Sequence, residues 1–126
     1  MKKIISSTYK KDKYYESIKI AVNTLLKKIT VITPVEVLIQ TGNLTKKNYE
    51  NWRFGRIPYL EKVIACNLSA ITRKLRILKY YAISSGLKPS KTVYKSWSKG
   101  EKVLLKFLKT GNELIEELYS THYILK

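Results

Sequence analysis

Residues 33–64 read TPVEVLIQTGNLTKKNYENWRFGRIPYLEKVI, a series of three short helical patterns separated by two breaks. Thr33 and Glu36 form a capping box with Pro34 at the first helical position, so that a hydroxyl and a carboxylate can satisfy free N–H groups. Gly42 can adopt the left-handed conformation that ends a helix. The stretch therefore predicts a helix that begins at Pro34 and ends before Gly42.

The second and third patterns carry signals of the same kind. Thr45 can cap a second helix, which turns Tyr49 and Trp52 toward the interior. Gly55 and Pro58 then end that helix and start a third one. We interpret this stretch as the helical centre to which the rest of the chain attaches.

The order helix, turn, helix is that of a helix-turn-helix motif, whose second helix presents its first turn to a DNA groove. Arg53 and Arg56 flank the bend that follows, and two guanidinium groups beside a rigid corner favour anion binding. The alternative is an ordinary packed helical hairpin, because two short helices around a glycine occur in many folds. The residues expected to approach the groove are Lys46, Lys47, Asn48 and Asn51.

The composition is strongly basic. The chain has 126 residues with 44% hydrophobic content, which suits one compact domain. Its 25 Lys and Arg against 9 Asp and Glu give a formal net charge of +16 at pH 7. Such an excess causes self-repulsion that a polyanionic partner would relieve. Nucleic acid is the first candidate, because phosphate neutralisation releases counterions, and a membrane surface or an acidic protein is the second.

The cysteine count and the hydropathy of the chain indicate the cellular compartment in which we expect the protein. The single cysteine, Cys66, excludes an internal disulfide and a cysteine-based zinc site. The basic N-terminus lacks an apolar run long enough for a signal peptide, and no segment reaches membrane-spanning length. We expect a soluble cytoplasmic protein without a cofactor, and a composition rich in Lys, Ile, Tyr and Asn suggests a bacterial or phage origin. Its oligomeric state stays open.

Two longer amphipathic helices flank the centre. The first is predicted over residues 13–29, where apolar side chains recur at steps of three and four. Residues 1–12 before it are expected to be flexible or loosely packed. The second helix begins after Asn67 as its N-cap and ends at Gly86. Nearly opposite its apolar stripe lies a second stripe, formed by Ser69, Arg73, Arg76 and Tyr80.

Between residues 62 and 100 the cationic residues are accompanied by no Asp or Glu. Because a merely solvated surface usually mixes both signs of charge, we interpret this run as a nucleic-acid-binding feature. The alternative is a lysine-rich surface with evenly spread charge. The nine cationic residues are Lys62, Arg73, Lys74, Arg76, Lys79, Lys88, Lys91, Lys95 and Lys99.

Residues 92–109 predict a β-hairpin, preceded by a break at residues 87–90. Its first half is rich in β-branched and aromatic side chains, a turn signal follows at residues 98–100, and apolar side chains then alternate at period two. Tyr94 and Trp97 could stack on nucleic-acid bases, and core packing of Trp97 is the alternative. The hairpin lysines expected to contact flanking phosphates as a wing are Lys95, Lys99 and Lys102.

A last helix is predicted from Glu113, with carboxylates near its start, where the helix dipole favours negative charge. Glu116 and Glu117 point about 100° apart on a helix and so do not form a catalytic pair. His122 has no nucleophile, carboxylate or further metal ligand near it in sequence, and we interpret it as structural. The sequence has no phosphate-binding glycine loop, dinucleotide fingerprint or zinc-finger spacing.

The string Trp52-Arg53-Phe54-Gly55-Arg56-Ile57-Pro58-Tyr59-Leu60-Glu61 is similar to a W-R-x-G-R-x-P-Y-L-E string in a group of small uncharacterised bacterial proteins. The ending, from Lys88-Pro89-Ser90 through Thr121-His122-Tyr123, resembles theirs as well. The resemblance covers residues 33–123 and implies a single compact unit. The resemblance implies no particular activity, because none is assigned to those proteins.

Together these features predict a mainly α fold over residues 1–126. We expect a compact helical domain with a helix-turn-helix-like centre and a C-terminal β-hairpin, which a winged-helix arrangement would satisfy. The expected function is nucleic-acid binding without catalysis, with DNA favoured over RNA. The expected binding residues are Lys46, Lys47, Asn48, Asn51, Arg53, Arg56, Arg73, Lys74, Arg76, Lys79, Lys95, Lys99 and Lys102.

Charge reversal at Arg73 and Arg76 should then flatten the salt dependence of binding. One alternative is a basic protein that binds an acidic protein or a nucleic-acid enzyme, as an inhibitor or accessory factor does. Another is a small nuclease that uses His122 with scattered carboxylates and a metal ion.

Overall fold

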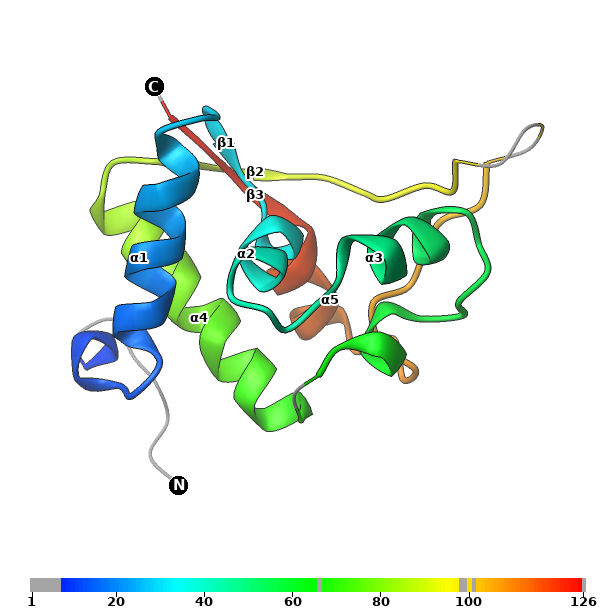
Figure 1. Cartoon of the computed structure of the whole chain (residues 1–126), viewed down its shortest axis with the longest axis horizontal. Coiled ribbons are helices and arrows are strands. Elements are labelled where there is room, and N and C mark those ends of the chain that lie inside the picture. Colours follow the sequence, from blue (N-terminus) through cyan, green and yellow to red (C-terminus); the bar gives the residue numbers. More distant parts are fainter. Residues whose placement is uncertain (1–7, 66, 98–99, 101, 126) are drawn as a thin grey trace.

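The computed structural model describes residues 8–65, 67–97, 100 and 102–125, and it confirms a mainly α-helical chain with one small sheet (Figure 1). α1 lies at one end of the long axis, and α3 lies toward the other end, together with the two arms of residues 92–97 and 102–109 (Figure 1). Among the helices described, none is both long enough and apolar enough to cross a membrane. The elements in chain order are η1 (Tyr9–Lys11), α1 (Tyr15–Leu26), β1 (Val31–Ile32), α2 (Pro34–Gln40), α3 (Lys46–Arg53), η2 (Leu60–Val63), α4 (Leu68–Ser84), β2 (Lys88–Lys91), α5 (Glu113–Ser120) and β3 (Thr121–Ile124).

The helices α1 and α4 pack together to form one half of the core. The helix predicted over residues 13–29 forms over the shorter range Tyr15–Leu26. Ile18 and Val22 of α1 are buried in one cluster with Ile77 and Leu78 of α4. Apolar side chains at steps of three and four thus meet along the two helices, and burial of such stripes drives their packing.

The segment before α1 is packed against this half. Tyr9 of η1 is 5% exposed, and its hydroxyl is hydrogen-bonded to Ser84 Oγ at 3.0 Å. Its ring centroid lies 5.6 Å from that of Tyr15. The expectation that residues 1–12 are loosely packed is therefore wrong for residues 8–12, and residues 1–7 lie outside the described part. Tyr9 and the ion pair of Asp12 with Arg73 hold the segment against α4.

A three-stranded antiparallel sheet in the order β1-β3-β2 covers the same half. Tyr123 at the centre of β3 faces Ile32 on β1 and Pro89 on β2. The predicted break at residues 87–90 is wrong, since Lys88–Lys91 is strand β2. An edge strand tolerates proline, and β2 is mostly exposed, so it lacks the apolar alternation by which strands are recognised.

The centre of the chain folds as its capping signals predict. Thr33 Oγ1 accepts the Glu36 N–H at 3.0 Å at the start of α2. Thr45 Oγ1 accepts the Asn48 N–H at 3.1 Å at the start of α3. Gly42 between them has a φ of 82°, a left-handed conformation that glycine adopts without strain. The predicted third helix is the short 3-10 helix η2.

Trp52 of α3 occupies the middle of the second half of the core. Its side chain is fully buried, and its Nε1 donates a hydrogen bond to the Lys106 carbonyl oxygen at 2.8 Å. Its ring centroid lies 4.9 Å from that of Phe107 and 5.6 Å from that of Tyr94. The aromatic contacts and the hydrogen bond together fix the orientation of α3.

Helix α5 closes this half through Glu116. Its carboxylate accepts the backbone N–H of Phe107 at 3.1 Å and that of Leu108 at 2.7 Å. A charged acceptor for two backbone donors stabilises the loop before α5 more than two neutral hydrogen bonds would. Glu116 therefore holds the loop of Phe107 and Leu108 in place, in addition to its favourable interaction with the helix dipole.

The hairpin prediction is confirmed only as a pair of arms. In the described residues, the arms form one bridge, Lys95 with Leu104. Two backbone hydrogen bonds flank it, from the Leu105 N–H to the Tyr94 carbonyl oxygen and from the Ser96 N–H to the Val103 carbonyl oxygen, both at 2.9 Å. The three strands of the sheet come from other parts of the chain. A winged-helix arrangement is therefore not confirmed.

Candidate nucleic-acid interface

Helix α3 turns its first two residues to solvent because the opposite side is anchored by Trp52. Lys46 and Lys47 are exposed in the first helical turn. Asn48 is half-buried, and the Asn51 Oδ1 accepts a hydrogen bond from Arg56 Nη1 at 3.0 Å. Of the four predicted groove-reading residues, the two lysines face solvent, whereas the Asn51 amide already has a partner.

The first arm of the hairpin docks on the C-terminal end of α3. The Trp97 N–H donates to the Arg53 carbonyl oxygen at 2.7 Å. The Trp97 ring lies edge-on to Tyr49 at 5.8 Å and to Phe54 at 5.5 Å between centroids. Trp97 is nevertheless 41% exposed and Phe54 is 44% exposed. One part of the indole packs on α3, as the core alternative expected, and the rest meets solvent.

Helix α3 with the bend after it and the two hairpin arms form one surface. We call it the α3–hairpin surface and define it as residues 46–56, 94–97 and 102–105. Its exposed cations are Lys46, Lys47, Arg56, Lys95 and Lys102, and its exposed acid is Glu50. Lys99 of the predicted wing lies outside the described residues.

Arg53 links the helix to the arm. Its guanidinium carbon lies 5.0 Å from the Tyr94 ring centroid and 4.7 Å from that of Trp97. Its Nε is buried and has no hydrogen-bond acceptor among the residues that the structure describes. Arg56 lies in the same way over the Phe54 ring, at 5.0 Å. Each arginine therefore lies over an exposed aromatic ring, and a cation–π contact with the ring face does not itself use the guanidinium N–H donors.

A cavity of about 550 Å³ lies beside α3, lined by Lys46 and Arg53 together with Tyr94, His122 and Glu36. Burial raises the pKa of the Tyr94 phenol and of the Glu36 carboxyl, and burial lowers the pKa of the His122 imidazole. Several groups with shifted pKa values in one cavity indicate a candidate functional site. Packed hydrogen-bond networks produce the same pKa shifts.

His122 connects the first arm to the sheet. Its Nε2 is hydrogen-bonded to the Tyr94 hydroxyl at 3.0 Å and lies 3.3 Å from Thr92 Oγ1. Thr92 also donates to the Ser120 carbonyl oxygen at 2.6 Å. These contacts agree with the structural interpretation of His122. Within the described residues, no cluster of three or more His, Cys, Asp or Glu could hold a metal ion.

The cations of α4 that were predicted to bind nucleic acid lie in different environments. Arg73 forms an ion pair with Asp12, whose side chain is only 2% exposed. Lys74 is 9% exposed, donates to Asn43 Oδ1 at 2.8 Å and lies 4.9 Å from the Tyr14 ring centroid. The prediction that Lys74 contacts nucleic acid is corrected accordingly, because a buried and hydrogen-bonded ammonium group cannot reach a phosphate.

Arg76 and Lys79 lie on another part of the molecule, where they line a groove with β2 and α5. The basic run of residues 62–100 therefore does not form one surface. Charge reversal at Arg73 would break its ion pair with Asp12, so that variant reports on folding as well as on binding.

Sequence reasoning missed Phe54 as a surface residue. It directly follows α3 and precedes Gly55, where the chain turns away from the core and no apolar partner covers the ring fully. A phenylalanine between two arginines at a glycine bend was the signal that could have found it.

Comparisons of the chain with protein-family models, with curated protein sequences and with solved structures gave no match.

Proposed function

We propose that the protein binds nucleic acid through the α3–hairpin surface and that it does so without catalysis. The exposed lysines of α3 and of the arms supply phosphate contacts that depend on salt concentration. Arg53 and Arg56 add guanidinium groups held in place by the rings beneath them. The surplus charge of +16 gives long-range attraction toward a polyanion.

The exposed pair of rings, Phe54 and Trp97, is the observation that carries this proposal and narrows it. Unpaired bases stack on exposed aromatic rings, and stacking tolerates any base. Reading of a duplex groove would instead need the Asn51 amide, which is hydrogen-bonded to Arg56. We therefore favour single-stranded segments over a helix-turn-helix contact with duplex DNA.

A salt titration with three labelled ligands tests the proposal: single-stranded DNA, a duplex of the same length, and a structured RNA. Fluorescence anisotropy should show the tightest binding for the single strand, with affinity falling as salt rises. Equal or tighter binding of the duplex would favour groove docking, and absence of binding at low salt would reject the function.

Trp97→Leu separates stacking from general charge attraction. The variant keeps an apolar side chain on Tyr49 but removes the ring, so single-strand affinity should fall by about 1–3 kcal/mol, or at least about fivefold. Ile20→Ala is the matched control, because Ile20 is an apolar side chain on α1 that is 58% exposed. Unchanged affinity in Trp97→Leu would remove base stacking from the proposal.

A further inference from the structure

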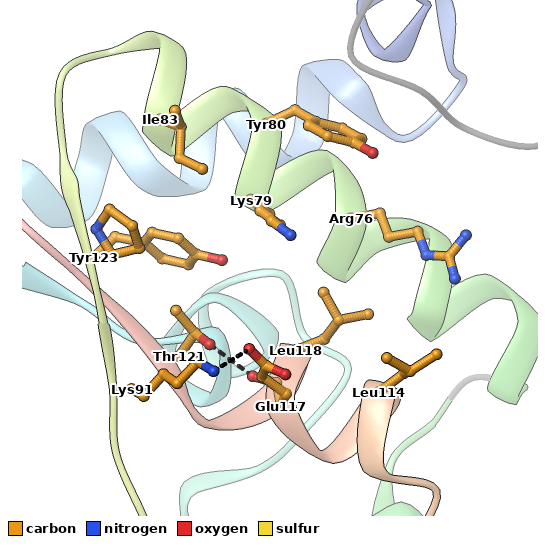
Figure 2. A pocket seen from close by; sticks show the side chains of 11 residues that line it. Arg76, Lys79, Tyr80, Ile83, Lys91, Leu114, Glu117, Leu118, Thr121 and Tyr123 are labelled. Atoms are coloured by element: carbon orange, nitrogen blue, oxygen red, sulfur yellow. Dashed lines mark hydrogen bonds and ion pairs between the residues drawn. The ribbon is translucent and has the colours of Figure 1, made fainter.

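A groove of about 640 Å³ opens between α4, the β2–β3 edge and α5 (Figure 2). Its lining residues are all different from those of the cavity beside α3. The volume falls within the range of about 300–1,000 Å³ that is usual for small-molecule sites. The side chains that α4 contributes are spaced to share one helical face: Arg76, Lys79, Tyr80 and Ile83.

Part of the groove lining is apolar and open to solvent. Leu114 and Leu118 come from successive turns of α5, and Leu114 is 72% exposed. Ile83 of α4 is 46% exposed in the same groove. Exposed aliphatic side chains on both walls provide a surface for an apolar body of a ligand.

The groove lining also offers hydrogen-bond donors. Tyr123 is 1% exposed, and Figure 2 shows its hydroxyl directed into the groove from the buried ring. That hydroxyl makes no hydrogen bond with any residue that the structure describes. The ammonium group of Lys79 points into the same space (Figure 2), and neither Lys79 nor Arg76 has an ion-pair partner among the described residues.

The groove lining has one carboxylate, that of Glu117, against the three cationic side chains of Arg76, Lys79 and Lys91. Glu117 Oε1 lies 3.2 Å from Lys91 Nζ, an ion pair that Figure 2 shows at the rim. The groove therefore keeps a positive balance from Arg76 and Lys79. Burial, followed by the nearby Glu117, raises the pKa of the Tyr123 phenol, so its hydroxyl stays protonated and can donate at neutral pH.

We propose that this groove binds a small organic anion, a molecule with an apolar body and one carboxylate or phosphate group. The anionic oxygen atoms accept hydrogen bonds from the Tyr123 hydroxyl and from Lys79, with Arg76 at the same wall. The apolar body covers Leu114, Leu118 and Ile83. A small anion that lacks an apolar body gains only the charge contacts and binds more weakly.

Calorimetric titration of the full chain with matched probes tests this site. The probes are 1-naphthoate and 1-naphthyl phosphate, with 1-naphthalenemethanol as the uncharged control and acetate and inorganic phosphate as the controls without a ring. Both naphthyl anions should bind at one site per chain and more tightly than every control, and the tighter of the two identifies the preferred acid group. Binding of the alcohol as tightly as the anions would overturn the proposal.

Two conservative variants locate the binding. Lys79→Gln and Tyr123→Phe should each weaken 1-naphthoate binding about tenfold, because each removes a hydrogen bond to a charged group. Tyr123→Phe keeps the buried ring, and its hydroxyl has no partner to lose among the described residues, so the fold should persist in a thermal melt. Lys28→Gln, an exposed lysine after α1, is the matched control for charge. Equal weakening in all three variants, or in none, would contradict a site in this groove.

Discussion

The cations of α4 and those of α3 have the same chemistry, but the fold uses them differently. On α4, Arg73 pairs with Asp12, and Lys74 is buried against Asn43 and Tyr14. On α3, Lys46 and Lys47 face solvent. The difference shows that a basic stripe in a sequence becomes a binding surface only where no other segment of the chain covers it.

The segments that pack against α4 and α3 determine whether the cations of each helix are covered or exposed. The segment of η1 places the buried carboxylate of Asp12 and the ring of Tyr9 against α4. Arg73 of α4 therefore holds the N-terminal segment in place. The anchor of α3 is Trp52 on its inner side, which leaves the lysines outward. We therefore expect changes in the first region to alter stability and changes in the second to alter binding.

The largest effect on stability is expected from Asp12→Ala. It removes the carboxylate that forms the ion pair with Arg73, including the Oδ1 that accepts the Tyr14 N–H at 3.0 Å. Loss of one partner of a buried pair costs about 3–5 kcal/mol, and the lower end applies because the Arg73 side chain is 27% exposed. Denaturant unfolding measures the loss.

Glu50→Ala is the matched control for Asp12→Ala, because it removes the same charge from an exposed position on α3. Its free energy of unfolding should stay within about 0.5 kcal/mol of the wild type. If the two substitutions cost the same, the two regions do not differ as described.

A smaller effect is expected from Lys74→Met. The apolar chain fills the same space, and Asn43 Oδ1 keeps the hydrogen bond that Thr41 Oγ1 donates at 2.9 Å, so the cost should be about 1 kcal/mol. Binding of single-stranded DNA should be unchanged. A loss of affinity without a loss of stability would return Lys74 to the binding surface.

The smallest effect is a pH dependence set by His122, the one histidine of the chain. Burial lowers its pKa in the folded chain, so the unfolded chain binds a proton more readily. Stability is then full above the unfolded pKa and declines as pH falls through the interval between the unfolded and folded pKa values. In His122→Gln the decline over mildly acidic pH should be shallower, and an identical pH profile for both proteins would show that His122 does not titrate with unfolding.

The helical centre could be predicted from the sequence because its signals are local. Thr33, Thr45 and Asn67 each cap the helix that directly follows, and Gly42 ends a helix within the same stretch. No distant residue is needed to recognise these positions.

The sheet and the α4 cations could not be predicted because they depend on distant segments. β2 is exposed and contains a proline, and it becomes a strand only because β3 from the end of the chain pairs with it. The ion pair of Arg73 depends on where Asp12 lies, 61 residues away. For the interface, the sequence identified the lysines of α3, whereas the exposure of Phe54 and Trp97 required the packing of the arm on the helix.

The most direct test of an outward α3 surface is the salt dependence of single-stranded DNA binding in two double variants of equal charge. In Lys46→Gln/Lys47→Gln, the slope of log affinity against log salt should become shallower by about 1.4, since each phosphate contact on a single strand contributes about 0.7. Lys27→Gln/Lys28→Gln removes two adjacent exposed lysines next to α1, at the other end of the molecule (Figure 1), and should keep the wild-type slope. Equal slopes in the two double variants would contradict the account, because the positive charge would then act from every side of the protein alike.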